Sequence, residues 1–405
     1  MITSHPGLRV IEGTVTTPRG YRAAGIHCGI KADRPDLALI VADVPASAAG
    51  MFTTNEMRSA PVIQNEAKLV SGRAQAMIIN SGNANACTGP RGFDDARAMA
   101  AAAAAALGIA EGLVLTASTG VIGRPLPIDR ITAAVPALVA ALGAGGTAAA
   151  HAIMTTDAFP KTAAVVVDLG DGRVTIGGIA KGAGMIHPSM ATMIAVTTTD
   201  AAVEPPLLRQ ALRAAVNRTF NCISVDGDTS TSDTVIVMAN SAAGAAPLVA
   251  GDGRYEAFVA GLTDVAGRLA KMIVADGEGT TRVVEVAVRG AASDADARAA
   301  ANTVMTSLLV KTAFHGAELN WGRISGALGR SPARIDPDRV AIAIGDVWVV
   351  RNGVGIPETY PAAQELLTPS EVRVTIDLGL GQGTFTGWTS DLGETYVKIN
   401  SGYLS

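Results

Sequence analysis

Residues 181–196 read KGAGMIHPSMATMIAV: a lysine and closely spaced glycines come first, then a proline turn and an apolar strand. Thr192 stands where that strand begins. A loop that enters a core strand would account for the pattern, because threonine favours extended backbone. The alternative is a nucleophile, since a hydroxyl becomes reactive when a base lies beside it. The chain offers no obvious His and Asp partner for Thr192, so such a base must come from elsewhere.

Scission of the chain before Thr192 would supply that base. The new α-amine and the hydroxyl then belong to one residue, so the covalent structure itself holds them together. An α-amine has a pKa of about 7.7–8.0, close to the working pH, and can therefore accept a proton and return it. The junction between Ala191 and Thr192 is thus a candidate cleavage point and a candidate catalytic centre.

The composition is that of a compact globular protein. Of 405 residues, 48% are hydrophobic and 17% charged, which excludes a disordered chain. A net charge of −4 and 4% aromatic residues argue against a nucleic-acid partner. Three widely spaced cysteines predict neither a disulfide framework nor a zinc site. The uncharged stretch at residues 131–150 is broken by Pro136 and by the glycine-rich run at 143–146, so we expect a soluble helix over residues 129–142 and not a membrane span. With no signal-peptide core, we expect a cytoplasmic protein.

Strands and helices mix along the whole chain. Residues 37–44 and 76–80 are predicted to be buried strands, and residues 94–107 an Ala-rich helix. The pattern restarts near residue 280, with a capped helix from Ser293 to Val310. Hairpins are predicted over residues 340–351 and 372–389. We therefore expect a mixed α/β (α+β) fold of two domains, residues 1–280 and 281–405.

Several familiar site motifs are missing. The sequence has no phosphate-binding P-loop, no zinc-protease motif and no nucleophile elbow, and its five histidines lack metal-ligand spacing. The acidic stretch at residues 226–233 hints at calcium, but Thr231 stands where an EF-hand loop needs glycine. We predict no metal site and no cofactor.

Motifs along the whole chain resemble the ornithine acetyltransferase (glutamate N-acetyltransferase) family. These are self-cleaving enzymes of arginine biosynthesis with an N-terminal threonine nucleophile. Besides residues 181–193, the resemblance is carried by GIHCGIK at 25–31, NSGNANACTG at 80–89, STGVIG at 118–123, MTTD at 154–157, residues 226–234, DGEG at 276–279, NWGR at 320–323 and the tail 400–405.

The resemblance implies a role for each matching residue. The chain would cut itself between Ala191 and Thr192, and Thr192 would take the acetyl group of N2-acetylornithine and pass it to glutamate. Thr119, through its hydroxyl, and Gly120, through its backbone N–H, would form the oxyanion hole. The residues implied to bind substrate are Thr155, Lys181, Thr192, Glu278, Asn400 and Ser405. We expect His187 to be structural, and Cys87 to be a small buried filler.

The family fold is an α-β-β-α sandwich similar to that of the N-terminal-nucleophile hydrolases. The resemblance implies that the C-terminal tail of the smaller domain returns to the active site. It also implies that fragments 1–191 and 192–405 stay associated, as a heterotetramer. Some members also use acetyl-CoA as a substrate, and we favour that bifunctional form. The alternatives are a monofunctional transferase, a self-processing aminopeptidase or amidohydrolase, and a non-catalytic binding protein.

Overall fold

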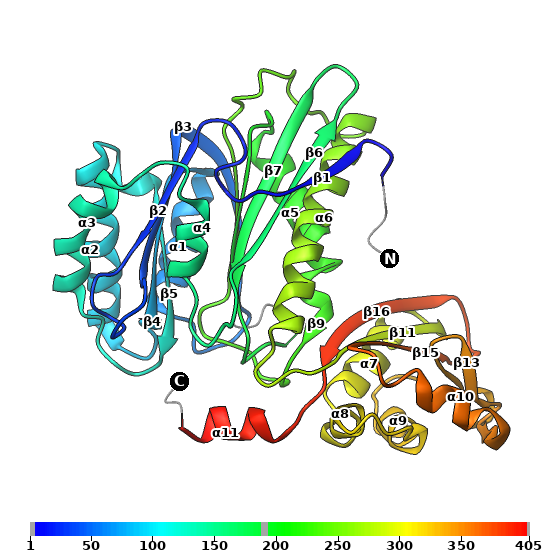
Figure 1. Ribbon diagram of the computed structural model, residues 1–405. Coiled ribbons are helices and arrows are strands. Elements are labelled where there is room, and N and C mark those ends of the chain that lie inside the picture. The colour runs from blue at the N-terminus through cyan, green and yellow to red at the C-terminus, as the bar shows by residue number, and fades with distance from the viewer. Residues whose placement is uncertain (1–4, 188–192, 403–405) are drawn as a thin grey trace. The chain divides into compact units, whose positions relative to one another are not determined.

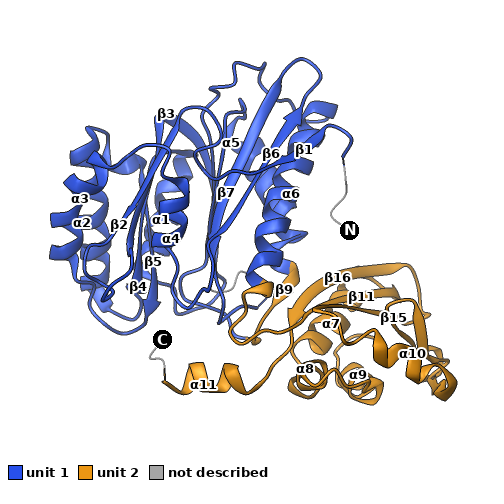
Figure 2. Cartoon of the chain, viewed as in Figure 1, with its two compact units in different colours: residues 1–221, 228–273, 404–405 blue, residues 222–227, 274–403 orange. Residues whose placement is uncertain are grey.

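The computed structural model describes residues 5–187 and 193–402 of the chain, and Figure 1 shows its helices and strands. The chain divides into two compact units (Figure 2): residues 1–221, 228–273 and 404–405 form the first, and residues 222–227 and 274–403 the second. Each unit has a β-sheet and helices of its own. The mixed α/β class predicted from the sequence is confirmed.

A nine-stranded sheet runs through the first unit. Its order is β1 (Leu8–Ile11), β6 (Lys161–Asp168), β7 (Arg173–Lys181), β8 (Ile194–Thr199), β10 (Thr234–Ala239), β3 (Leu37–Phe52), β4 (Arg73–Asn83) and β5 (Val114–Val121), with β2 (Tyr21–Ile26) also paired to β3. β8 runs parallel to β10, and β4 runs parallel to β5. The other neighbours are antiparallel.

Strand β3 belongs to two layers of this sheet. Residues 37–42 pair with β2, and residues 47–52 pair with β10. Side chains alternate along a strand, so Leu37 and Leu39 pack against α2 (Gly89–Leu107) and α3 (Ile128–Ala140). Ala38 and Ile40 pack in the opposite cluster, with side chains of β7, β8 and β10. The space between the two layers is therefore a buried apolar core.

Two helices cover the outer face of the layer that contains β7, β8 and β10. They are α5 (Pro205–Asn217), which contacts β3 and β10, and α6 (Gly253–Ala275). α6 lies close against β7, because a Cβ at Gly178 would be 3.0–3.1 Å from side-chain atoms of Leu269 and Val265. The layers thus follow the order helix, sheet, sheet, helix (Figure 1), and the predicted α-β-β-α sandwich is confirmed.

The uncharged stretch at residues 131–150 forms parts of two short helices. α3 ends at Ala140, and α4 (Gly146–Ala152) follows after the glycines. α4 lies so close to β2 that a Cβ at Gly25 would be 2.1 Å from the Ala148 carbonyl oxygen. Within residues 5–187 and 193–402, no helix has the length and apolar character that crossing a membrane requires.

A seven-stranded sheet forms the centre of the second unit. Its order is β14 (Val354–Gly355), β13 (Val347–Arg351), β12 (Ala341–Ile344), β15 (Glu371–Asp377), β11 (Val283–Ala291), β16 (Gly383–Ser390) and β9 (Ile223–Ser224). The helices of this unit are α7 (Asp294–Met305), α8 (Leu308–His315), α9 (Trp321–Gly329), α10 (Tyr360–Glu365) and α11 (Glu394–Gly402). The sequence assigned residues 222–227 to the first domain, but β9 pairs with β16.

Two local predictions in this unit were wrong. Residues 372–389 do not form a hairpin, because β11 lies between β15 and β16 and pairs with both. The glycine-rich connection passes close to the end of β11, where a Cβ at Gly381 would be 2.6 Å from the Ala291 carbonyl oxygen. The helix expected over residues 293–310 is two helices, and Ser307 occupies the N-cap position of the second. The hairpin at residues 340–351 is confirmed.

Candidate active site

Three of the predicted site residues meet inside the first unit. Thr119 lies near the end of β5 and Lys181 at the end of β7. Lys181 Nζ donates a hydrogen bond to Thr119 Oγ1 over 3.4 Å, and both side chains are buried. Thr155 lies between α4 and β6, and its backbone N–H donates to Asp157 Oδ2 at 2.9 Å. Asp157 Oδ2 is also 4.0 Å from Lys181 Nζ, so one carboxylate connects the three residues.

The backbone at Gly120 requires glycine. Its φ is +128°, and a Cβ there would be 2.4 Å from the carbonyl carbon of Gly82 on the neighbouring strand β4. The two glycines face each other in the parallel ladder. Because only hydrogen occupies that side of the chain, the peptide at residue 120 can approach β4 closely.

The motif at residues 80–89 braces the ends of β4 and β5. Ser118 Oγ donates to Asn80 Oδ1 at 2.6 Å, and Asn80 Nδ2 donates to the Asn83 carbonyl oxygen at 2.9 Å. Asn83 Nδ2 in turn donates to the carbonyl oxygens of Arg124 and Pro125. These buried amides therefore fix the end of β5, which carries Thr119 and Gly120, and the loop that follows it.

Asp157 and Lys161 form a buried ion pair that the sequence analysis did not single out. Lys161 Nζ lies 2.7 Å from Asp157 Oδ1, and both side chains have no exposed surface. The Gly182 N–H also donates to Asp157 Oδ1 at 2.7 Å. Burial opposes ionisation, but the charges of Lys181 and Lys161 hold the pKa of the Asp157 carboxyl well below its usual range. Asp157 belongs to the MTTD motif at residues 154–157, and that motif is the signal in the sequence that could have identified it.

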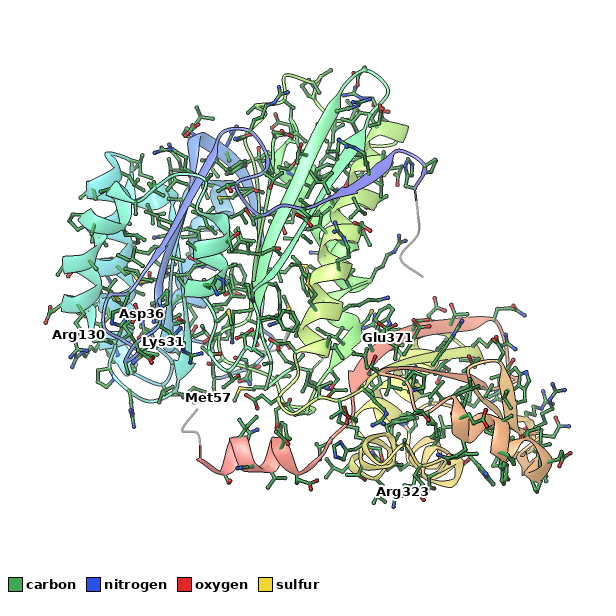
Figure 3. All side chains as sticks on the ribbon, in the orientation of Figure 1. Lys31, Asp36, Met57, Arg130, Arg323 and Glu371 are labelled. Carbon is green, nitrogen blue, oxygen red and sulfur yellow. The ribbon has the colours of Figure 1, made fainter. Side chains whose placement is uncertain are left out.

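The motif at residues 25–31 comprises the last two residues of β2 and the start of the loop that follows it. Asp36 Oδ1 accepts from the Cys28 N–H, and its Oδ2 accepts from those of Ile30 and Lys31, at 2.6–2.9 Å. Lys31 Nζ reaches the Met154 carbonyl oxygen at 2.6 Å, next to Thr155. Burial, together with the charge of Arg34, lowers the pKa of Lys31 to about 8. Figure 3 shows Lys31 and Asp36 close together in this region.

A second buried carboxyl lies next to the expected cleavage junction. Asp233 precedes β10, has no exposed surface, and accepts the Met193 N–H on Oδ1 at 3.0 Å. Its Oδ2 has no hydrogen-bond partner among the described residues. Burial raises the pKa of Asp233 well above its usual value. A buried carboxyl group whose pKa is strongly raised is a candidate functional residue.

Replacing Asp233 with Asn is expected to stabilise the folded protein at neutral pH. The folded state binds the Asp233 proton more tightly than the unfolded chain does, so stability falls as pH rises from about 4 towards the raised pKa. Asn cannot ionise and escapes that loss, which is about 1.4 kcal/mol for each unit of raised pKa. Thermal melts should show the variant melting above the wild type at pH 8, with the difference shrinking towards pH 4. A difference that grows towards acid would contradict the assignment.

The second unit holds the other described residues that were predicted to bind substrate, Glu278 and Asn400. Asn400 on α11 donates from Nδ2 to Glu278 Oε2 at 2.7 Å. Tyr396 on the same helix donates its hydroxyl to Asp226 Oδ2 at 3.3 Å. The segment before α11 is anchored by Asp391, which accepts from Thr281 and faces His315 Nδ1 at 2.7 Å. The carboxylate of Glu278 and the side-chain amide of Asn400 therefore lie within hydrogen-bonding distance of each other.

Other predicted residues have different outcomes. Ala191, Thr192 and Ser405 lie outside the described residues. His187 is half-buried, and burial lowers its pKa. Cys87 is exposed, so its prediction as a buried filler was wrong. Its φ is +57°, in the tight turn that leads into α2. Among the described residues, no group of three or more His, Cys, Asp or Glu side chains could hold a metal ion.

Comparisons with known proteins show a similarity that extends over nearly the whole chain. A family model described as the ArgJ family matches residues 22–405. The arginine biosynthesis bifunctional protein ArgJ of Symbiobacterium thermophilum is 50% identical over 397 residues, covering 97% of this chain and 99% of that protein. The protein of the same name from Geobacter sulfurreducens is 49% identical over 388 residues, covering 95% and 99%.

A solved structure is also similar to part of the chain. It is that of ornithine acetyltransferase complexed with ornithine from Mycobacterium tuberculosis. It is 44% identical with a TM-score of 0.42, and the match covers 45% of this chain and 98% of that one.

Proposed function

This chain belongs to the ArgJ family, and on that premise we propose that it is an acetyltransferase of arginine biosynthesis. It moves the acetyl group of N2-acetylornithine to glutamate, giving ornithine and N-acetylglutamate. It also acetylates glutamate from acetyl-CoA. The name of its relatives, bifunctional protein, supports this second reaction.

Self-cleavage prepares the nucleophile. The hydroxyl of Thr192 attacks the carbonyl carbon of Ala191, the C–N bond breaks as the nitrogen takes up a proton, and an ester remains. Water hydrolyses that ester and leaves the carboxyl group of Ala191 and the free α-amine of Thr192. The amine then accepts the hydroxyl proton when Thr192 attacks the acetyl donor, and it protonates the departing ornithine nitrogen. The α-amine of glutamate takes the acetyl group by the same steps in reverse.

Each of these attacks creates a tetrahedral oxyanion that needs donors fixed in advance. The single observation that best supports the proposal is the buried contact between Lys181 and the Thr119 hydroxyl, one residue before Gly120. A hydroxyl already held in a water-poor setting costs little to align during the reaction. We assign Thr119 and the Gly120 N–H to this oxyanion hole.

The substrate is an amino acid, and the proposed binding residues suit one. Lys181 offers a cation for a carboxylate, and Glu278 offers a carboxylate for an ammonium group. Thr155, Asn400 and Ser405 supply further polar groups. The acyl transfer needs no cofactor, because Thr192 carries the acetyl group itself. We also propose that fragments 1–191 and 192–405 stay together in a heterotetramer, and that the enzyme works in the cytoplasm.

The deciding experiment offers N-acetylornithine and acetyl-CoA separately, each with glutamate. We expect N-acetylglutamate from both donors, measured by mass spectrometry. Product from N-acetylornithine alone would identify a monofunctional transferase. Steady acetate release without glutamate would identify an amidohydrolase. Absence of any acetyl transfer would overturn the proposal.

A further inference from the structure

One buried carboxylate joins the two parts of the proposed site in the first unit. Asp157 accepts the Thr155 N–H on Oδ2, and the Gly182 N–H and Lys161 Nζ on Oδ1. Lys181 Nζ lies 4.0 Å from Oδ2, so the carboxylate attracts this ammonium group by charge. Asp157 therefore fixes the backbone on both sides of the site as well as the Lys181 side chain.

The contact between Lys181 and Thr119 determines what the Thr119 hydroxyl can do. An ammonium group has three donors and no acceptor, so Thr119 Oγ1 must accept in their hydrogen bond of 3.4 Å. A hydroxyl has one hydrogen, and that hydrogen is then not directed at Lys181. The arrangement prepares the Thr119 hydroxyl to donate to an oxygen that becomes negative.

We propose that Asp157 is a positioning residue for acetyl transfer, acting through Lys181 to keep the Thr119 hydroxyl oriented as a donor. This inference rests on the function proposed above. Asp157 itself touches neither substrate nor the reacting atoms. Lys161 has a separate part: at 2.7 Å it forms the closer ion pair with Asp157. Lys161 thereby balances a charge that would otherwise be costly to bury.

The charge pair determines which variants are informative. Asp157→Asn alone removes the carboxylate that lies 2.7 Å from the buried Lys161 ammonium group, and breaking a buried ion pair from one side destabilises a fold strongly. The double variant Asp157→Asn/Lys161→Met removes both charges together and is expected to fold. Asp200→Asn is the matched control, because Asp200 is also buried and also accepts backbone N–H groups, those of Thr175 and Arg19. We expect the control to keep its kcat within about 3-fold.

A double-mutant cycle with Thr119→Val tests the route of action. Thr119→Val removes the hydroxyl and should lower kcat with N-acetylornithine about 100-fold. The Asp157→Asn/Lys161→Met variant should lower kcat by about 30–100-fold in the wild-type background, with a smaller change in KM. When added to Thr119→Val, it should cost no more than about 3-fold further, because the group it orients is already gone. The rate of self-cleavage, followed on denaturing gels, should show the same non-additivity.

Each outcome decides the inference. Full additivity with Thr119→Val, or a folded double variant with wild-type kcat, overturns it while leaving the proposed function intact. Wild-type protein that transfers no acetyl group overturns the proposed function itself. If circular dichroism shows that the double variant is unfolded, Lys181→Met replaces it, since that change leaves the Asp157–Lys161 pair in place. Its effect on kcat must then also be non-additive with Thr119→Val.

Discussion

Thr192→Ala is expected to remain a single polypeptide of 405 residues and to lose acetyl transfer by about 10,000-fold or more. Alanine has no hydroxyl to attack the Ala191 carbonyl, so the amine that serves as base is never released. Wild-type protein should run on denaturing gels as two pieces of about 19 and about 22 kDa, in proportion to their shares of 41.0 kDa. Intact-mass measurement should place the cut before residue 192.

Thr192→Ser is the matched control, because it keeps the hydroxyl and loses one methyl group. We expect it to be cut and to transfer acetyl groups. An uncut but fully active wild-type enzyme, or a Thr192→Ala variant that still separates into two pieces, would end the case for an N-terminal nucleophile.

Gly120→Ala is expected to have the second-largest effect. The new Cβ would be 2.4 Å from the Gly82 carbonyl carbon, and the backbone φ of +128° is one that alanine avoids. We expect the free energy of unfolding to fall by about 3 kcal/mol or more, because two strands must separate. Displacing the N–H at residue 120 should also lower kcat by about 100-fold or more. Thermal melts and transfer assays on the same preparation measure the two effects.

Gly123→Ala separates backbone strain from close approach. Gly123 also has a positive φ, of +78°, but nothing lies within 4 Å of its Cβ position. We expect it to cost only about 1–2 kcal/mol and to leave kcat within about 3-fold. Equal losses in the two variants would show that the approach of Gly120 to β4 is unimportant.

Hydrophobic patterning predicted the fold class because apolar runs indicate buried strands. Residues 37–42 of the strand predicted over 37–44 are indeed buried, whereas Asp43 and Val44 are exposed. It did not predict which strands are neighbours. Residues 372–378 and 384–389 were predicted to form a hairpin, since glycines join them, but β11 lies between the two strands. A glycine-rich sequence indicates that the chain turns. It does not indicate whether another strand lies between the two strands that the turn connects.

The candidate site was predictable in part. Thr119, Lys181 and Thr155 came from the family resemblance, and the structure brings them together around Asp157. Lys161 was not predictable, because a lysine four residues after an aspartate is usually a solvated surface pair. Burial of both side chains, which only the fold determines, makes this pair different. The burial of Asp233, whose Oδ2 lacks a hydrogen-bond partner among the described residues, likewise becomes visible only when its neighbours are known.

The strand order of the first unit has a consequence for the two pieces of a cut chain. β8 and β10 follow residue 192, yet they lie between β7 and β3, which both precede it. The later piece is therefore inserted into the middle of the earlier one, hydrogen-bonded on both flanks. Separating the two pieces would break the β7–β8 and β10–β3 ladders, and neither piece contains all the strands of the nine-stranded sheet. If the chain is cut before residue 192 as proposed, folding is therefore expected to precede the cut, and the two pieces are expected to stay associated through this shared sheet.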